Sequence, residues 1–176
     1  MRLREVVSEK EWSLVENLYM AAFPENERKP FQMIREKQRQ GVTDVWMIEE
    51  NNAFSGFAIT MNGEDLVLLD YFAICEEKRG QGLGGKSLRA LQEQYSGKRF
   101  FLEVESLKVS ADNMEERRRR KQFYLNNGMK ELGVYAKLFG VEFELLGFEG
   151  KVTFGEYFSL YDAIYGQYAS KFLEEL

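Results

Sequence analysis

Histidine is absent from this chain of 176 residues, and cysteine occurs only once. Without histidine, no His-based general base or catalytic triad is available, and one cysteine excludes an intrachain disulfide. Structural zinc sites draw mainly on cysteine and histidine, so we expect no metal centre. The lack of disulfide chemistry suits a reducing compartment, and we expect a cytoplasmic protein.

Long apolar runs are missing too. None approaches the roughly 18 residues of a membrane span, and the opening residues 1–5 lack the apolar core of a secretion signal. A net charge of −5 argues against a nucleic-acid partner. The hydrophobic fraction of 44% and the aromatic fraction of 14% are those of a globular protein. We therefore expect one folded domain that binds neither membrane nor nucleic acid.

The most informative segment runs from Arg79 to Ser87 and reads RGQGLGGKS. It lies between an apolar run, Leu66 to Ile74, and a helical pattern, Gln81 to Tyr95. A strand that leads into a glycine turn and a helix presents backbone N–H groups at the positive end of the helix dipole. Glycine also lets a ligand approach the backbone closely. The segment therefore predicts a site for a phosphate or pyrophosphate.

One interpretation of the glycines is a dinucleotide site. Gly80, Gly82 and Gly85 match G-x-G-x-x-G, and the acids Glu103 and Glu105 follow roughly 20 residues later, where a ribose-binding carboxylate is expected. However, the charged link 76–79 separates the glycines from the strand, and the chain before them reads as hairpins rather than βαβ units. An NAD-binding protein is thus the less favoured interpretation, and a glycine loop without any ligand is less favoured still.

Hydrophobic periodicity and turn signals predict a mixed α+β chain. Motifs of the capping-box type begin three predicted helices, at Ser8, Asp112 and Thr153. The pairs 51–52 and 62–63 predict hairpin turns. The predicted strands are 2–6, 45–49, 53–61, 66–74, 100–105, 134–139 and 141–148, and the predicted helices are 8–23, 31–40, 81–95, 112–127 and 153–174.

The spacing Arg79-x-x-Gly82-x-Gly84 resembles the acetyl-CoA signature of the GNAT N-acetyltransferase superfamily, (Gln/Arg)-x-x-Gly-x-(Gly/Ala). The predicted order β-α-α-β-β-β-α-β-α-β-β resembles the GNAT fold, an α+β fold with a mixed sheet, over residues 1–148. The resemblance implies a single transferase domain over 1–176, with a helical extension at about 153–174. The aromatic stripe of that extension, which includes Tyr168, would pack on its own domain or, alternatively, form a homodimer contact.

The resemblance also implies where acetyl-CoA binds. The glycine loop would hold the pyrophosphate, and the end of the preceding strand would pair with the pantetheine arm. An N–H near Ala73 or Ile74 would serve the oxyanion, although core packing is the plainer role for Phe72 and Ile74. The implied acetyl-CoA-binding residues are Phe72, Ala73, Ile74, Arg79, Gly80, Gln81, Gly82, Leu83, Gly84, Gly85, Lys86 and Ser87.

Two further elements resemble the catalytic parts of the family. Phe123-Tyr124, with Gly128 four positions on, resembles an element whose tyrosine often protonates the CoA thiolate, and a phenol with a pKa near 10 suits that role. Leu102-Glu103-Val104 resembles an element of members that acetylate peptide N-termini, in which the glutamate acts as a base through water. Asp70 is a rival base, and a structural salt bridge is the alternative role for either acid.

The run Arg117 to Lys121 looks like a nucleic-acid patch but is better interpreted as a solvated helix face. The pairs Glu115–Arg119 and Glu116–Arg120 have the favourable i, i+4 order. Arg117 stands where many family members carry an asparagine that contacts CoA, so that role does not transfer. One cation of the run could instead reach the 3′-phosphate of CoA.

We therefore expect an acetyl-CoA-dependent N-acetyltransferase that acts by direct transfer in a ternary complex, with Tyr124 as acid, Glu103 as base, and no metal. The polar loop 24–31 would wall the acceptor site, and its acids Glu25 and Glu27 would attract a cationic amine. A CoA-binding module without activity is the alternative. The acceptor stays open among a peptide N-terminus, lysine, a polyamine, an aminoglycoside and a small amine.

Overall fold

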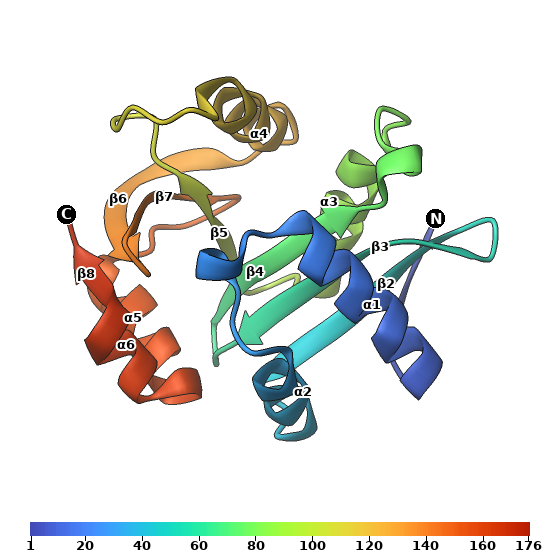
Figure 1. The fold of residues 1–176 in the computed structure, drawn as a ribbon. Helices are drawn as coiled ribbons and strands as arrows, with labels where there is room; N and C mark the ends of the chain where they lie inside the picture. The colour runs from blue at the N-terminus through green and yellow to red at the C-terminus, as the bar shows by residue number, and fades with distance from the viewer. The chain divides into compact units, whose positions relative to one another are not determined.

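The computed structural model describes residues 1–176, with the exception of the side chain of Tyr168. The chain divides into two compact units. Unit one comprises Met1–Asn62 and Leu69–Ser96, and unit two comprises Gly63–Leu68 and Gly97–Leu176. Figure 1 shows the elements of both. Among the helices whose residues are described, none is long and apolar enough to cross a membrane.

Unit one contains an antiparallel meander, as the hairpin signals predict. Strands β1 (Arg2–Glu5), β2 (Thr43–Glu50) and β3 (Ala53–Asn62) are neighbours in that order, followed by β4 (Leu66–Ile74), whose first residues belong to unit two. The β2–β3 turn has Asn51 and Asn52 at φ values of 53° and 60°. Two consecutive residues with positive φ are the requirement of a type I′ turn, which confirms the predicted hairpin.

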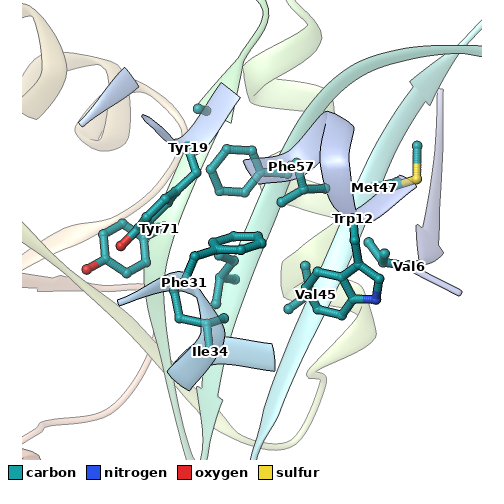
Figure 2. Close-up of a cluster of buried hydrophobic side chains, with 12 residues drawn as sticks. Val6, Trp12, Tyr19, Phe31, Ile34, Val45, Met47, Phe57 and Tyr71 are labelled. Atoms are coloured by element: carbon teal, nitrogen blue, oxygen red, sulfur yellow. The ribbon is translucent and has the colours of Figure 1, made fainter. Parts of the chain in front are cut away.

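Three α-helices surround this meander: α1 (Glu9–Ala22), α2 (Phe31–Arg39) and α3 (Leu83–Gln94). The capping box between Ser8 and Glu11 is present at the start of α1. Side chains of α1, α2 and the strands share one buried cluster, shown in Figure 2. Val45 and Met47 of β2 join that cluster, whereas Trp46 points to the other face and donates to the hydroxyl of Tyr95, just past α3. The strands are therefore covered on both faces.

Unit two is built on strands β5 (Arg99–Glu105), β7 (Val141–Gly147), β6 (Lys130–Leu138) and β8 (Leu173–Glu175), which are neighbours in that order and antiparallel. Its helices are α4 (Met114–Asn126), α5 (Phe154–Tyr165) and α6 (Gln167–Phe172). Helix α4 stops before Gly128, which has a φ of 95°, as predicted. The predicted cap at Asp112 is wrong, because α4 begins after Asn113.

The C-terminal extension differs from the single helix that the sequence predicts. Gly166, with a φ of 53°, divides it into α5 and α6. The chain then turns into β8, which pairs with β6 and places Leu173 opposite Leu138. The spacing of the aromatic residues does not reveal this break, because the single Gly166 leaves their helical periodicity unchanged. The predicted place of Tyr168 on the apolar face lies outside the described residues.

Candidate functional site

In unit one, strand β4 leads through a 3₁₀ turn, Glu76–Lys78, into the glycine loop and α3. Gly82 is the N-cap of α3 and has a φ of 76°, and Gly80 has a φ of 74°. A Cβ built on either glycine would meet no atom within 4 Å. The loop backbone is therefore accessible, and only glycine adopts its conformation without strain.

The loop fits a pyrophosphate through its backbone. The first helical hydrogen bond of α3 runs from Lys86 N–H to the Gly82 carbonyl at 3.2 Å, so the N–H groups of the first turn point out of the helix. These donors lie at the positive end of the α3 dipole and suit phosphate oxygens. The Ser87 hydroxyl is buried and donates to the Leu83 carbonyl at 2.9 Å. Its side chain thus fixes the helix start.

At the end of β4, the backbone N–H and C=O groups of successive residues point to opposite sides of the strand. Cys75 N–H donates to the Ser55 carbonyl of β3 at 2.9 Å, and the Ala73 carbonyl lies 2.4 Å from where a Cβ on Gly56 would be. Residues 73 and 75 thus point their backbone groups toward β3. Because these directions alternate along a strand, Phe72 and Ile74 point theirs to the opposite edge. Of the two N–H groups that the sequence suggests for an oxyanion, that of Ile74 points away from β3.

Arg79 stabilises this junction from its side chain. Its Nε donates to the Ile74 carbonyl at 3.0 Å, and Gln81 Nε2 donates to the Glu77 carbonyl at 3.2 Å. Both side chains therefore bind the backbone of the β4–α3 connection itself. The side chain of Arg79, a residue of the sequence signature, thus stabilises the turn in the structure.

In unit two, Tyr124 lies near the end of α4 and is 8% exposed. Its ring packs edge-to-face against Phe123 at 5.1 Å between centroids. Burial raises the pKa of Tyr124 to about 12, and the Arg120 guanidinium opposes that rise. A phenol with this pKa is protonated throughout the physiological range.

Glu103 lies in the middle of β5, opposite Leu145 of β7. It is half-buried, and its Oε1 accepts a hydrogen bond from the hydroxyl of Tyr157 on α5. The sequence indicates Glu103 but gives no signal for Tyr157 as its partner, because the two residues are 54 positions apart. The structure brings the C-terminal extension onto the candidate base.

The carboxylate of Glu105, two residues further along β5, is bound by side chains of the basic helix α4 and of the residue before it. Its side chain is 4% exposed. Asn113 Nδ2 donates to Oε1 at 3.2 Å, Arg117 lies 3.3 Å from the same oxygen, and Arg120 binds Oε2. The predicted pairing of Arg120 with Glu116 is therefore wrong, because a buried carboxylate is the stronger partner. Asn113 also serves this carboxylate rather than a helix cap.

The next cation of the run, Lys121, pairs with acids on strands β7 and β6. Its Nζ lies 2.7 Å from Glu144 of β7, whose side chain is 2% exposed, and it also pairs with Glu131 of β6. Arg118 faces solvent and pairs with Glu115. The run is thus only partly the solvated face that the sequence suggests, because Arg117, Arg120 and Lys121 attach α4 to the strands of unit two.

Asp70, the rival base on β4, forms a buried ion pair with Lys29 in unit one. Lys29 belongs to the loop between α1 and α2. Burial raises the pKa of the Asp70 carboxyl, and the nearby Lys29 ammonium opposes that rise. The alternative that the sequence leaves open for this acid, a structural salt bridge, is the arrangement that the structure contains.

Known protein families and solved structures include matches to this chain. Residues 12–122 match the family model described as the acetyltransferase (GNAT) family. A search of curated protein sequences finds no match. Among solved structures, a GNAT-family protein from Bacteroides thetaiotaomicron has a TM-score of 0.76 at 21% identity, covering 94% of this chain and 99% of that one.

Two further solved structures have names that state an acceptor. An aminoglycoside 6'-N-acetyltransferase complexed with coenzyme A has a TM-score of 0.68 at 14% identity and covers 86% of this chain and 99% of its own. The ribosomal-protein-alanine N-acetyltransferase of Brucella melitensis has a TM-score of 0.60 at 15% identity, with coverage of 84% and 98%. At these identities the likeness establishes the fold, which is the α+β fold with a mixed sheet that the element order predicts.

Proposed function

Because this chain belongs to the acetyltransferase (GNAT) family, we propose that it is an N-acetyltransferase that moves an acetyl group from acetyl-CoA to a primary amine by direct transfer. The observation that carries this proposal is the glycine loop at the start of α3, with Gly80 and Gly82 at positive φ and an accessible backbone. We propose that residues 1–176 act together as one transferase domain in the cytoplasm.

The proposed binding of acetyl-CoA uses the groups that unit one presents. The backbone of Arg79–Ser87 would hold the pyrophosphate at the positive end of α3. The edge of β4 formed by Phe72 and Ile74 would bind the pantetheine arm, with Ile74 N–H directed to the thioester oxygen. Ala73, between these two residues, belongs to the same proposed binding segment.

The proposed proton transfers use unit two. Glu103 takes a proton from the ammonium form of the acceptor through a water molecule, which gives the amine its lone pair. The nitrogen then forms a bond to the acetyl carbon while the carbon–sulfur bond breaks. Tyr124 donates its phenolic proton to the departing thiolate, and the proton released by the product nitrogen restores the phenol through solvent. The pKa of about 12 for Tyr124 keeps this donor protonated before transfer.

The acceptor is a primary amine, and three acceptor chemistries are supported by names among similar structures: aminoglycoside, ribosomal-protein alanine and spermidine. We propose that the loop Pro24–Phe31 borders the acceptor site. Its Glu25 is exposed and gives this border the negative charge that a protonated amine prefers.

A thermal-shift titration with acetyl-CoA, CoA and NADH in parallel tests the cofactor. A ligand at 100 times its Kd stabilises the folded state by about 2.7 kcal/mol. We expect stabilisation by acetyl-CoA and CoA only. Stabilisation by NADH alone would contradict the proposal and favour a dinucleotide-binding protein.

Turnover is then measured as thiol release with an alanine-initiated peptide, spermidine and kanamycin as acceptors. We expect Tyr124→Phe to lower kcat by about 10²-fold, the lower end for acid catalysis, while the Kd for acetyl-CoA changes little. Tyr135→Phe, which removes a hydroxyl from another tyrosine of unit two, is the matched control. Binding of acetyl-CoA without transfer to any amine would favour the CoA-binding module without activity.

A further inference from the structure

Helix α5 lies beyond residues 12–122 that match the family model, yet one of its side chains reaches the candidate base. The hydroxyl of Tyr157 donates a hydrogen bond to Oε1 of Glu103 on β5. The ring of Tyr157 is fully buried, while Glu103 is half-buried. A buried donor that holds one oxygen of a partly exposed carboxylate fixes the direction in which that carboxylate points.

The ring of Tyr157 has little freedom of its own. Phe101, two residues before Glu103 on β5, meets it edge-to-face at 6.0 Å and 90°. Phe154 and Tyr161 of α5 meet it at 6.2 Å and 5.9 Å, also near perpendicular. Edge-to-face contacts on several sides leave one ring orientation favourable. The hydroxyl is therefore directed at Glu103 by the packing of the ring.

Helix α5 is itself fixed to β5. Its first turn carries the Thr153–Glu156 capping box. Glu156 also pairs with Arg99, the first residue of β5, at 2.8 Å, and Arg99 donates to the Lys151 carbonyl at 2.7 Å. The hydrogen bonds to Glu156 from Arg99 and Thr153 lower its pKa to about 2, so it stays charged near neutral pH. These contacts thus connect the start of α5 to the strand that carries Glu103.

From this geometry we propose that Tyr157 is a positioning residue for Glu103, so that the C-terminal extension supplies part of the transferase site. The inference rests on the proposed function, in which Glu103 accepts a proton from the amine through water. Tyr157 would hold the carboxylate in its ionised form and in one rotamer, because a hydroxyl donor favours the charged acceptor. Tyr157 itself exchanges no proton with the substrate in this role.

The charged groups around Glu103 allow the effect of Tyr157 to be isolated. On β7, the residue opposite Glu103 is Leu145, which does not titrate. On β5, the next acid on the same face is Glu105, whose charge is compensated by Arg117 and Arg120 of α4. From α5, the hydroxyl of Tyr157 contacts Glu103. A change in the acidic limb of the pH profile on removal of that hydroxyl is therefore assigned to Glu103.

The test is the pH dependence of kcat/KM for acetyl transfer by Tyr157→Phe, with the best acceptor among an alanine-initiated peptide, spermidine and kanamycin. We expect kcat/KM to fall about tenfold or more through loss of orientation, with the KM for acetyl-CoA unchanged. The midpoint of the acidic limb should move to higher pH, because one hydrogen bond to the charged form is lost. Tyr161→Phe, one turn further along α5, should keep the wild-type profile.

A double-mutant cycle separates positioning from a general loss of structure. In the Glu103→Gln background, Tyr157→Phe should have no further effect on kcat, because its partner has already lost its charge. If Tyr157→Phe fails to fold, fluorotyrosine at position 157 keeps the ring and makes the hydroxyl a stronger donor. The acidic midpoint should then move to lower pH.

The outcomes distinguish the inference from the proposed function. Wild-type transfer with an unchanged acidic limb in Tyr157→Phe, or equal losses in both backgrounds of the cycle, overturns the inference alone. A wild-type protein that transfers acetyl to none of the amines overturns the proposed function and, with it, this inference. A shifted midpoint together with a non-additive cycle establishes the positioning role.

Discussion

Lys29 and Asp70 form an ion pair in the interior of unit one, with Lys29 Nζ 2.7 Å and 2.9 Å from the two carboxylate oxygens. The side chains are 1% and 2% exposed. The backbone N–H of Lys29 also donates to the Tyr71 hydroxyl at 3.1 Å, and that hydroxyl donates to the Glu27 carbonyl at 2.9 Å. The loop that we propose to border the acceptor is thus attached to β4 at several points and is preformed.

Removing one partner of this ion pair should destabilise the protein strongly. Lys29→Met leaves Asp70 buried without its cation, and we expect the free energy of unfolding to fall by about 3–5 kcal/mol. Urea denaturation at pH 7 measures this change. Arg118→Ala, which breaks an exposed pair with Glu115, should change it by less than about 1 kcal/mol. A small effect of Lys29→Met would show that water or another group compensates Asp70.

The same variant has a predictable dependence on pH. Burial already raises the pKa of Asp70, and Lys29→Met removes the ammonium that opposes that rise. A group whose pKa is higher in the folded than in the unfolded state favours folding below its unfolded value, about 4, and loses that contribution as the pH rises. The deficit of Lys29→Met should therefore be smaller near pH 4 than at pH 7, and a deficit independent of pH would contradict this account.

The glycine loop should lose its ligand when a side chain is introduced at its accessible position. Gly82→Val places a branched side chain at the first turn of α3, where we propose the pyrophosphate, so binding of CoA in a calorimetric titration should become undetectable. Gly41→Val is the matched control, because Gly41 has a φ of 74° against 76° for Gly82 and the same open surroundings. Both variants carry the same backbone strain. Equal loss of binding in both would refute the placement of the site.

Helix α4 is attached to the strands of unit two by charge. Glu105→Gln keeps the shape of the side chain but leaves Arg117 and Arg120 without their carboxylate, so we expect a loss of about 3 kcal/mol in the free energy of unfolding. Glu115→Gln removes an acid whose side chain is 71% exposed, and it should cost less than about 1 kcal/mol. Thermal unfolding of the two variants side by side measures the difference. Equal melting temperatures would show that these ion pairs add nothing.

Much of the fold could be predicted because its signals are local. The Ser8–Glu11 and Thr153–Glu156 capping boxes and the Asn51-Asn52 turn each depend on residues a few positions apart, and all are present. The glycine loop could be predicted for the same reason, since the glycines that its positive φ values require lie close together in the sequence. Local backbone chemistry therefore positions the starts of α1 and α5 and the glycine loop at the start of α3.

The partners of the candidate catalytic groups could not be predicted, because they come from distant parts of the chain. Glu103 and Tyr157 are 54 positions apart, and Lys29 and Asp70 are 41 positions apart. The predicted cap at Asp112 failed for a related reason: Asn113 is drawn to the buried Glu105 of another element. Tertiary contacts of this kind outweigh local preferences worth about 1 kcal/mol.

Tyr124 should make the protein sensitive to alkali. Its pKa is raised by burial to about 12, against an ordinary value near 10. The folded state holds this proton more tightly, so its contribution to stability, on the order of 3 kcal/mol, is present below pH 10 and is lost as the pH rises through 12. Tyr124→Phe carries no such proton, and its free energy of unfolding should fall less steeply between pH 9 and pH 12 than that of the wild type. Burial also raises the pKa of Tyr19 and Tyr95, so the variant should retain part of the slope. Urea titrations at stepped pH measure both slopes, and parallel slopes would show that Tyr124 is open to water in the folded protein.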